Sequence, residues 1–333
     1  LDMVWAPEFA DAGWLAPLGR HAPVVTDFLA PALAAATWKD EVYALPWFVA
    51  VGMLYYRSDI FDRPPAVQEE IPEMAYLGRI AGAREAGPPD VGLIWPGNRD
   101  EGLIPVFVEY LGAYGGAILA ADGTVSVDSP QALAALRAMR RALDRGEVPR
   151  DALTWDGENA RATCQSGKAL LMRNWPYAIA AMNHDPASRV KGKFAVTTMP
   201  PAPGGRASAA LGGQLLAISR TSDQLDSAYE LIRFLTTPEE MAERARFGAQ
   251  FPARRSVYGG ELDDALGMPA AAALDLVDVA IAPPVTPLYA QLSVVLQTQL
   301  HLALSGKTAP QTALAEAARE IRALLAKPLP IKD

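Results

Sequence analysis

The sequence predicts an α/β fold in two lobes, and three observations support this prediction. Segments rich in Val, Tyr and Leu alternate with segments whose apolar residues recur at helical spacing, which is typical of α/β proteins. The chain has 333 residues, enough for two ordinary domains. Two Pro-rich or Gly-rich segments, 55–65 and 199–213, offer few apolar residues for a core. We therefore expect the chain to cross between the lobes at both segments.

The N-terminal part of the chain predicts strands with a short helix between them. LDMVW, at 1–5, is a short apolar segment that we expect to form a strand, and PEFADAGW follows it as a helical turn that ends at Gly13. EVYALPW (41–47) and VAVGMLYYR (49–57) are rich in β-branched and aromatic residues, which favour strands.

The middle of the chain predicts helices and one strand. GLIPVFVEYLGAYGG (102–116) has the composition of a buried helix closed by glycines, and DSPQALAALRAMRRALDRG (128–146) is amphipathic. In the second of these, Ser129 is the expected cap and Pro130 fits the first turn. GENARATCQSGKALLMRNW (157–175) predicts a helix, a glycine stop and then a strand.

The C-terminal half predicts two more strands and several helices. The strands begin at 192 and 212, and the expected helices are 222–235, 237–248 and most of 288–326. Thr237 is the expected cap of the helix at 237–248, because it precedes a proline and lies three residues before Glu240.

The two crossing segments predict discontinuous lobes. Lobe I is expected to contain 1–56 and 208–256, and lobe II to contain 57–207 and 257–333. Lobes of this kind, joined by a hinge, suit a protein that closes on a ligand.

Composition excludes several classes of function. The formal net charge is −8, so nucleic acid is not an expected partner. Cys164 is the single cysteine and the three histidines are scattered, so no metal site is expected. The apolar runs are too short to span a bilayer. Nucleophile elbows, phosphate-binding loops and dinucleotide fingerprints are absent, and we predict no cofactor and no catalytic residue.

Tryptophans at strand-to-loop junctions are the most informative candidates for a binding site. Trp5, Trp47, Trp95 and Trp175 all lie beside polar, Pro or Gly residues. A tryptophan in such a place either packs in the core or offers its face to a flat ligand, such as the apolar face of a sugar ring. Asp, Glu, Asn and Arg side chains would then bind the hydroxyl groups. From the residues alone both alternatives stay open.

Several segments in order resemble the extracellular solute-binding proteins of ABC importers, in particular the maltose- and trehalose-binding branch. The resemblance covers nearly the whole chain and rests on these segments: LDMVWAPEFADAGWLAPL, EVYALPWFVAVGMLYYRSDIF, GNRDEGLIPVFVEYLGAYGG, CQSGKALLMRNWPYA, LGGQLLAISRTS, AYELIRFLTTPEEM, FPARRSVY and PPVTPLYAQLS.

This resemblance implies a two-lobed periplasmic-binding-protein fold with a carbohydrate in the cleft between the lobes. The implied function is that of a receptor, which delivers its ligand to the permease subunits of an ABC transporter. We expect a periplasmic or extracellular monomer, free or lipid-anchored. Because the sequence starts abruptly with a strand-like segment, we also expect the first strand, first helix and second strand of the family to precede residue 1.

The resemblance also implies which residues bind the ligand. Trp175 would be a platform for a sugar, and Gly212 and Gly213 would let the backbone approach the ligand closely. Further binding positions follow from the matched segments and from the aromatic residues beside them: Asp2, Trp5, Trp47, Phe48, Trp95, Glu101, Glu158, Gln214 and Tyr289.

The chain departs from the family pattern at three of its positions. Ala50 stands where the family often has Asp or Asn, Gln214 where it often has Trp, and Pro283 where it often has Arg. We therefore expect weak binding of trehalose and maltose and tighter binding of another glycoside. The alternative function is a carbohydrate-active enzyme that uses two of the carboxylates of Asp2, Glu101 and Glu158 as acid and base.

Overall fold

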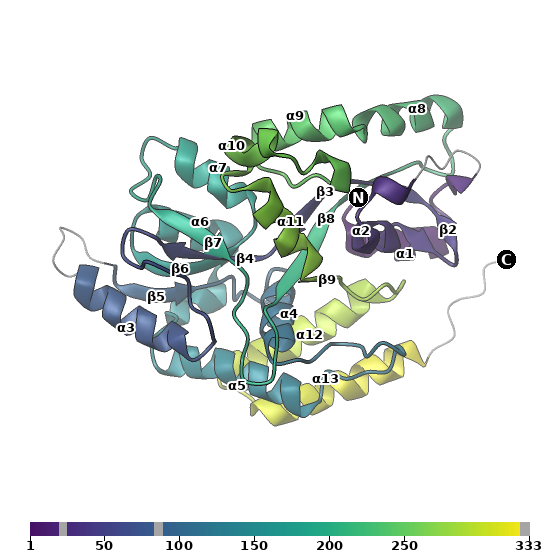
Figure 1. The fold of residues 1–333 in the computed structure, drawn as a ribbon. Helices are drawn as coiled ribbons and strands as arrows, with labels where there is room; N and C mark the ends of the chain where they lie inside the picture. The colour runs from purple at the N-terminus through teal and green to yellow at the C-terminus, as the bar shows by residue number, and fades with distance from the viewer. Residues whose placement is uncertain (20–24, 83–88, 327–333) are drawn as a thin grey trace. The chain divides into compact units, whose positions relative to one another are not determined.

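The structure is a computed structural model that describes residues 1–19, 25–82 and 89–326 (Figure 1). Within these residues, no helix combines the length and the apolar character needed to cross a membrane. Residue contacts divide the chain into two compact units. Unit 1 comprises Leu1–Val51, Trp175–Ala180 and Ala210–Ala290, and unit 2 comprises Gly52–Asn174, Ala181–Ala209 and Gln291–Asp333 as far as they are described. The mixed α/β class agrees with the prediction.

Unit 1 is built on a small sheet of strand order β3-β8-β9. Its strands are β3 (Ala44–Val51), β8 (Ala209–Ala217) and β9 (Ala280–Ile281). β3 and β8 are antiparallel, and their register shifts between Pro46 and Phe48. The shift places an irregularity at Trp47, which turns this tryptophan out of the regular alternation of the strand.

Helices and a hairpin complete unit 1. The hairpin consists of β1 (Thr37–Trp38) and β2 (Glu41–Val42). The helices are η1 (Met3–Trp5), α1 (Ala6–Asp11), η3 (Val25–Asp27), α2 (Ala30–Ala35), α8 (Leu225–Leu235), α9 (Pro238–Gly248), η5 (Arg255–Val257), η6 (Gly260–Leu262), α10 (Asp263–Leu266) and α11 (Ala270–Asp278). Thr237 caps α9 as predicted, since its hydroxyl accepts the N–H of Glu240.

The predicted strand at 1–5 is wrong for most of its length. Asp2 forms an isolated bridge with Gln214, but Met3–Trp5 is a turn of 3-10 helix. The cause is local, because the Asp2 side chain accepts the N–H of Val4 at 3.2 Å and so starts the turn.

The hairpin turn between β1 and β2 carries two residues with positive φ, Lys39 at 49° and Asp40 at 64°. This conformation costs energy for a residue with a side chain but not for glycine. Replacing Asp40 with glycine is expected to raise the unfolding free energy by about 0.5–1 kcal/mol. Urea unfolding measures the change, with Asp62→Gly as a control at an exposed aspartate whose φ is not positive. A loss of stability in Asp40→Gly equal to that in the control would contradict the expectation.

Unit 2 contains a four-stranded mixed sheet of order β5-β6-β4-β7. Its strands are β4 (Met53–Arg57), β5 (Val91–Ile94), β6 (Ala169–Asn174) and β7 (Phe194–Thr197). β5 and β6 are parallel, whereas β4 is antiparallel to both of its neighbours. β6 ends at Asn174, and the next residue, Trp175, belongs to unit 1.

The helices of unit 2 surround a large apolar core. They are α3 (Glu70–Gly82), α4 (Leu103–Ala113), α5 (Pro130–Asp144), η4 (Arg150–Thr154), α6 (Gly157–Gln165) and α13 (Pro310–Leu325), together with the second half of α7 (Tyr177–His184) and most of α12 (Tyr289–Leu304). α13 runs along α5 (Figure 1). Ser129 caps α5 as predicted, because its hydroxyl accepts the N–H of Ala132.

A buried ion pair lies within this core. Arg173 on β6 donates to Glu109 on α4 from Nε at 2.9 Å and from Nη2 at 2.5 Å, and the two side chains are 0% and 1% exposed. A Cβ atom at Gly52 would lie 1.7 Å from Glu109 Oε1. Glycine is therefore required at the first residue of unit 2 for the pair to form.

The predicted lobe boundaries differ from the observed units mainly at 257–290. We placed this segment in lobe II, whereas its contacts group it with unit 1. The physical reason is that α10 packs against α9 and that Gly267 lies against Ile179 of unit 1. The sequence shows no crossing signal near 290, because that crossing lies inside the continuous helix α12. The correspondence of these units to functional lobes stays a prediction.

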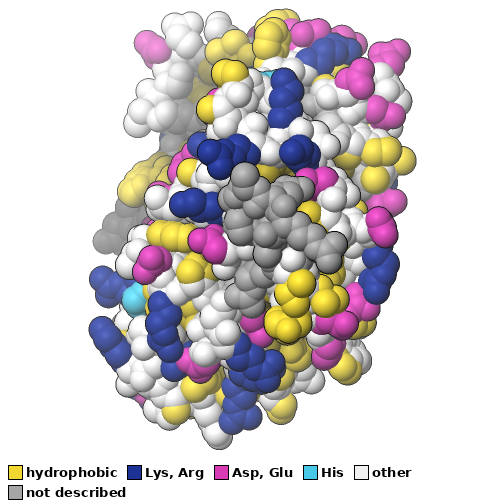
Figure 2. Space-filling view, turned by 90° about the vertical axis from the view of Figure 1, so that its left-hand side faces the viewer, with side chains coloured by type: hydrophobic (Ala, Val, Ile, Leu, Met, Phe, Trp, Pro, Cys, Tyr) yellow, Lys and Arg dark blue, Asp and Glu magenta, His cyan; other side chains and the backbone are white. Residues whose placement is uncertain are grey.

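Charged side chains of both signs are interspersed on the face drawn in Figure 2. Lys and Arg do not gather there into a continuous basic surface of the kind that binds nucleic acid.

Candidate functional site

Unit 1 contains a pocket of about 350 Å³ at the edge where β3 and β8 meet the N-terminal segment, and we call it the unit 1 pocket. Five segments that are distant in the sequence form its wall. The lining residues are Asp2, Phe48, Val49, Ala50, Trp175, Pro176, Tyr177, Gly213, Gln214, Ala249 and Gln250. The bridge between Asp2 and Gln214 and the pairing of Phe48 with Gln214 bring three of these segments together.

Trp175 lies half-buried against the glycine pair of β8. A Cβ atom at Gly212 would lie 3.1 Å from Cη2 of the Trp175 ring, so a side chain there would press on the ring. Gly213 has φ of 141°, and a Cβ atom at this residue would lie 2.4 Å from the Phe48 carbonyl oxygen. Gly212 therefore gives the indole the room that it occupies beside the strand, and Gly213 lets β8 pass close to the backbone of Phe48.

The residues that follow α9 form another part of the pocket wall. Ala249 has φ of 50° and turns the chain out of the helix, and Gln250 follows it into the pocket. Two contacts hold this segment: Val49 N–H donates to the Phe251 carbonyl at 2.9 Å, and Arg244 Nη1 lies 3.4 Å from Gln250 Oε1. The guanidinium of Arg244 also lies 3.7 Å from the centre of the Trp47 ring, a cation–π contact.

Asp2 supplies the one carboxylate among the residues that line the unit 1 pocket. Burial raises the pKa of this carboxyl above its ordinary value of 3.8, although hydrogen bonds from the N–H groups of Val4 and Met3 act in the opposite direction. The side chain can accept hydrogen bonds from a ligand when it is ionised. The pocket thus combines an aromatic face, a carboxylate and the amides of Gln214 and Gln250.

Comparison with protein families identifies the chain. The family described as bacterial extracellular solute-binding protein matches residues 1–270. The chain belongs to this family. The match covers most of unit 1 and a large part of unit 2, including every segment that lines the unit 1 pocket.

Two relatives resemble this solute-binding protein over most of its length. A probable ABC transporter-binding protein from Deinococcus radiodurans is 33% identical over 288 residues, which cover 84% of this chain and 68% of that protein. Among solved structures, maltose-bound MalE3 from T. maritima is 34% identical, with a TM-score of 0.88 over 97% of this chain and 83% of that one.

A more distant structure supports the fold alone. It is an ABC transporter solute-binding protein from Thermotoga lettingae with bound alpha-D-tagatose, 23% identical, with a TM-score of 0.85 over 98% of this chain and 84% of that one. Together the structures agree with the two-lobed α/β fold that the sequence predicts.

Five residues predicted to bind ligand in this solute-binding protein line the unit 1 pocket. They are Asp2, Phe48, Trp175, Gly213 and Gln214, and Gly212 lies directly behind the Trp175 ring. These residues are distant in the sequence, and the structure brings them together around one pocket, while their role in binding a ligand stays a prediction.

Other predicted residues of unit 1 lie outside the pocket lining. Trp5 is 46% exposed and stacks on Phe9, with ring centres 6.4 Å apart. Trp47 lies against Arg244, and its ring also contacts the ring of Phe48, which lines the pocket, with ring centres 5.7 Å apart. Tyr289 is only 3% exposed, because it begins the buried helix α12.

The predicted residues of unit 2 have different surroundings. Trp95 is 0% exposed inside the apolar core, so no face of its ring is open to a ligand, and its predicted role in binding is corrected to packing. Glu101 accepts a hydrogen bond from Ser293 of α12, which orients its carboxylate. Glu158 lies in the first turn of α6 and pairs with Arg161 at 2.9 Å.

Sequence reasoning missed part of the pocket wall. Ala249 and Gln250 carry no motif that marks them, because their place depends on the left-handed turn at Ala249 and on the long-range contact of Val49 with Phe251. The sequence does carry a signal for Tyr177, which lies two residues after Trp175 in the segment NWPYA.

Proposed function

We propose that this solute-binding protein is the carbohydrate receptor of an ABC importer and that the unit 1 pocket supplies part of its sugar-binding surface. One observation carries the proposal: Trp175 and Asp2 line a single pocket of about 350 Å³. An aromatic face beside hydrogen-bonding groups matches a sugar ring, which has an apolar face and a rim of hydroxyl groups. The maltose in the related T. maritima protein supports the same ligand class.

The role of the protein would be capture and delivery. The name of the D. radiodurans relative supports an ABC transporter as the partner, and the family is extracellular by its description. We infer that the receptor passes its carbohydrate to permease subunits of such a transporter. A monomeric state and lipid anchoring stay predictions from the resemblance.

The pocket favours binding over catalysis. Glycoside hydrolysis uses two carboxyl groups on either side of the bond that breaks. Among the described residues, the unit 1 pocket is lined by Asp2 but by no second acidic residue. The D. radiodurans relative is described as a probable ABC transporter-binding protein. We therefore propose a receptor that returns its ligand unchanged.

The raised pKa of Asp2 predicts a pH dependence of saccharide binding. The ionised carboxylate accepts hydrogen bonds from sugar hydroxyls better than the neutral acid does. Affinity should therefore be constant at neutral pH and fall as the pH decreases through the raised pKa, above the ordinary value of 3.8. The free energy of unfolding depends on pH in the opposite direction. Because the pKa of Asp2 is higher in the folded protein, Asp2 stabilises the fold below pH 3.8, and this contribution is lost as the pH rises through the folded-state pKa.

Isothermal titration of one bound saccharide across the acid range measures this dependence. Asp2→Asn is the control, because an asparagine can still accept the Val4 N–H but does not titrate. If the affinity of Asp2→Asn falls with decreasing pH as much as that of the parent protein, the pH dependence comes from another group.

Trehalose and maltose are predicted to bind weakly. Ala50 and Gln214 both line the pocket, so two of the three departures from the family pattern affect the ligand surface directly. A hydroxyl that enters without a partner loses its hydrogen bonds to water, at a cost of about 1–3 kcal/mol. Two such losses reduce affinity roughly a hundredfold or more.

Thermal unfolding with a panel of mono- and disaccharides tests both the function and this ranking. A saccharide at 100 times its Kd should stabilise the protein by about 2.7 kcal/mol. We expect a shift of the melting temperature with at least one saccharide and smaller shifts with maltose and trehalose at equal concentration. Sub-micromolar binding of maltose or trehalose would contradict the ranking, and no shift with any saccharide would contradict the function.

A further inference from the structure

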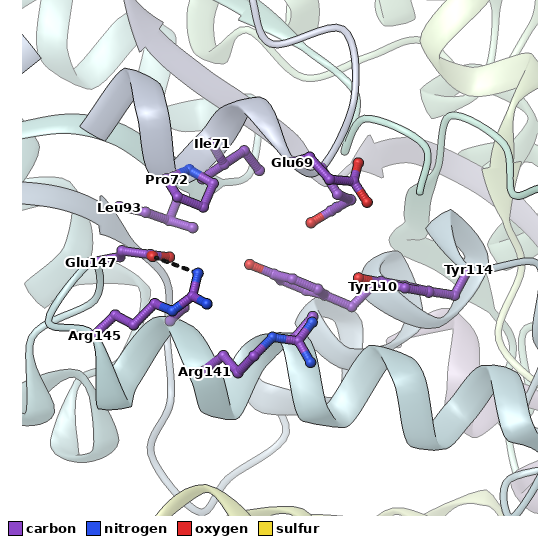
Figure 3. Close-up of a pocket in the computed structure, with 12 residues that line it drawn as sticks. Glu69, Ile71, Pro72, Leu93, Tyr110, Tyr114, Arg141, Arg145 and Glu147 are labelled. Carbon is purple, nitrogen blue, oxygen red and sulfur yellow. Dashed lines mark ion pairs between the residues drawn. The ribbon is translucent and has the colours of Figure 1, made fainter. Parts of the chain in front are cut away.

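Unit 2 contains a separate pocket, of about 230 Å³, that the carbohydrate function does not use. We call it the unit 2 pocket. It lies between the start of α3, strand β5 and the helices α4 and α5 (Figure 3). Its volume is below the range of about 300–1,000 Å³ that is usual for drug-sized ligands, which favours a ligand of only a few heavy atoms.

The floor of the unit 2 pocket is apolar and well packed. Ile71, Leu93 and Ala142 are 4%, 0% and 6% exposed. Gln68 is held in the wall by two hydrogen bonds, since its Nε2 donates to the Pro200 carbonyl at 3.1 Å and its backbone N–H donates to the Pro201 carbonyl at 3.0 Å. These contacts fix the shape of the pocket independently of any ligand.

Opposite charges stand on facing walls of the unit 2 pocket. Arg141 and Arg145 lie one turn apart at the C-terminal end of α5, so both reach the same wall. Glu69, next to the start of α3, lies across the cavity from Arg141, as Figure 3 shows. Glu147, whose side chain is 11% exposed, pairs with Arg145, and its Oε1 lies 3.9 Å from Arg145 Nη1.

A hydroxyl group points into the space between these walls. Tyr110 on α4 is 2% exposed, and its hydroxyl end is directed toward the centre of the cavity (Figure 3). Burial raises the pKa of Tyr110, so the hydroxyl stays protonated and can donate a hydrogen bond. Burial also raises the pKa of Tyr114, against the effect of the nearby Arg141 guanidinium, which bonds to its hydroxyl.

We propose that the unit 2 pocket binds a small zwitterion, with the chemistry of a free α-amino acid, between Arg141 and Glu69. The planar guanidinium of Arg141 binds the carboxylate of the ligand, and the Glu69 carboxylate binds its ammonium group. The Tyr110 hydroxyl donates to the ligand carboxylate, and the apolar floor takes a short side chain. A carboxylate alone or an amine alone would satisfy only one of the two charged walls.

Saturation-transfer NMR on the whole protein with L-alanine, acetate and ethylammonium as separate probes tests the proposal. L-Alanine is expected to bind about tenfold more tightly than either single-charge probe. Equal binding of acetate and L-alanine would overturn the zwitterion, and no signal with any probe would overturn the site.

Charge-removing variants locate the binding site. Arg141→Gln and Glu69→Gln are each expected to weaken L-alanine binding by about tenfold or more. Arg137→Gln and Glu73→Gln remove the same charges from exposed positions on the same two helices, outside the pocket lining, and should leave binding unchanged. All four side chains are exposed, so melting temperatures close to that of the parent protein are expected. Equal losses in the control pair would show nonspecific attraction and overturn the proposal. The result does not depend on saccharide binding, which concerns unit 1.

Discussion

Replacing Glu109 with alanine is expected to lower the unfolding free energy of the protein by about 3–5 kcal/mol. The change would leave the Arg173 guanidinium, which is 0% exposed, without its carboxylate partner inside the core of unit 2. Removing one member of a buried pair costs more than the pair itself contributes, because the remaining charge has lost its water. Urea unfolding followed by circular dichroism measures the shift of the midpoint.

Two further variants separate the buried charge from a general effect of mutation. Glu230→Ala breaks the pair with Arg233, in which both side chains are more than half exposed, and should cost less than about 1 kcal/mol. The double variant Glu109→Leu with Arg173→Met replaces the whole pair with apolar groups and should recover most of the loss. A loss in Glu109→Ala no larger than that in Glu230→Ala would contradict the account.

Replacing Trp175 with alanine is expected to weaken saccharide binding by about 1–3 kcal/mol, which is roughly 5- to 150-fold in Kd. The ring lines the unit 1 pocket and lies against Gly212, so its removal takes away a flat apolar surface of the pocket. Isothermal titration of the tightest-binding saccharide of the panel measures the loss.

Trp14→Ala is the matched control for this experiment. Trp14 is also a tryptophan of unit 1, is 58% exposed and does not line the pocket. Trp175→Phe should recover part of the affinity, since a smaller aromatic face remains. Unchanged affinity in Trp175→Ala, or an equal loss in Trp14→Ala, would show that Trp175 is not the platform.

Local signals in the sequence predicted most of the regular elements. Caps such as Ser129 and Thr237 act within one helical turn, so their effect can be read from neighbouring residues. The segment 1–5 shows the limit of this reasoning. Its apolar pattern favours a strand, but the Asp2 side chain bonds to the Val4 N–H and gives a 3-10 turn.

Contacts between distant residues explain what the sequence did not predict. Trp95 has the same junction pattern as Trp175, yet it is buried in the core of unit 2, while Trp175 is half-buried against the glycines of β8. Gln250 reaches the unit 1 pocket because the chain turns at Ala249 and returns along Val49. A single sequence contains no short-range pattern for either outcome, since both depend on tertiary packing.

The most direct test of the receptor function is to bind a saccharide, recover it and identify it. The tightest-binding saccharide of the panel would be titrated into the protein by calorimetry, held with it overnight and then examined by quantitative NMR. The account predicts saturable binding by the parent protein, loss of affinity in Trp175→Ala, and recovery of the sugar unchanged. Appearance of a hydrolysis or transfer product in the presence of the protein, and not in its absence, would contradict the receptor and indicate an enzyme.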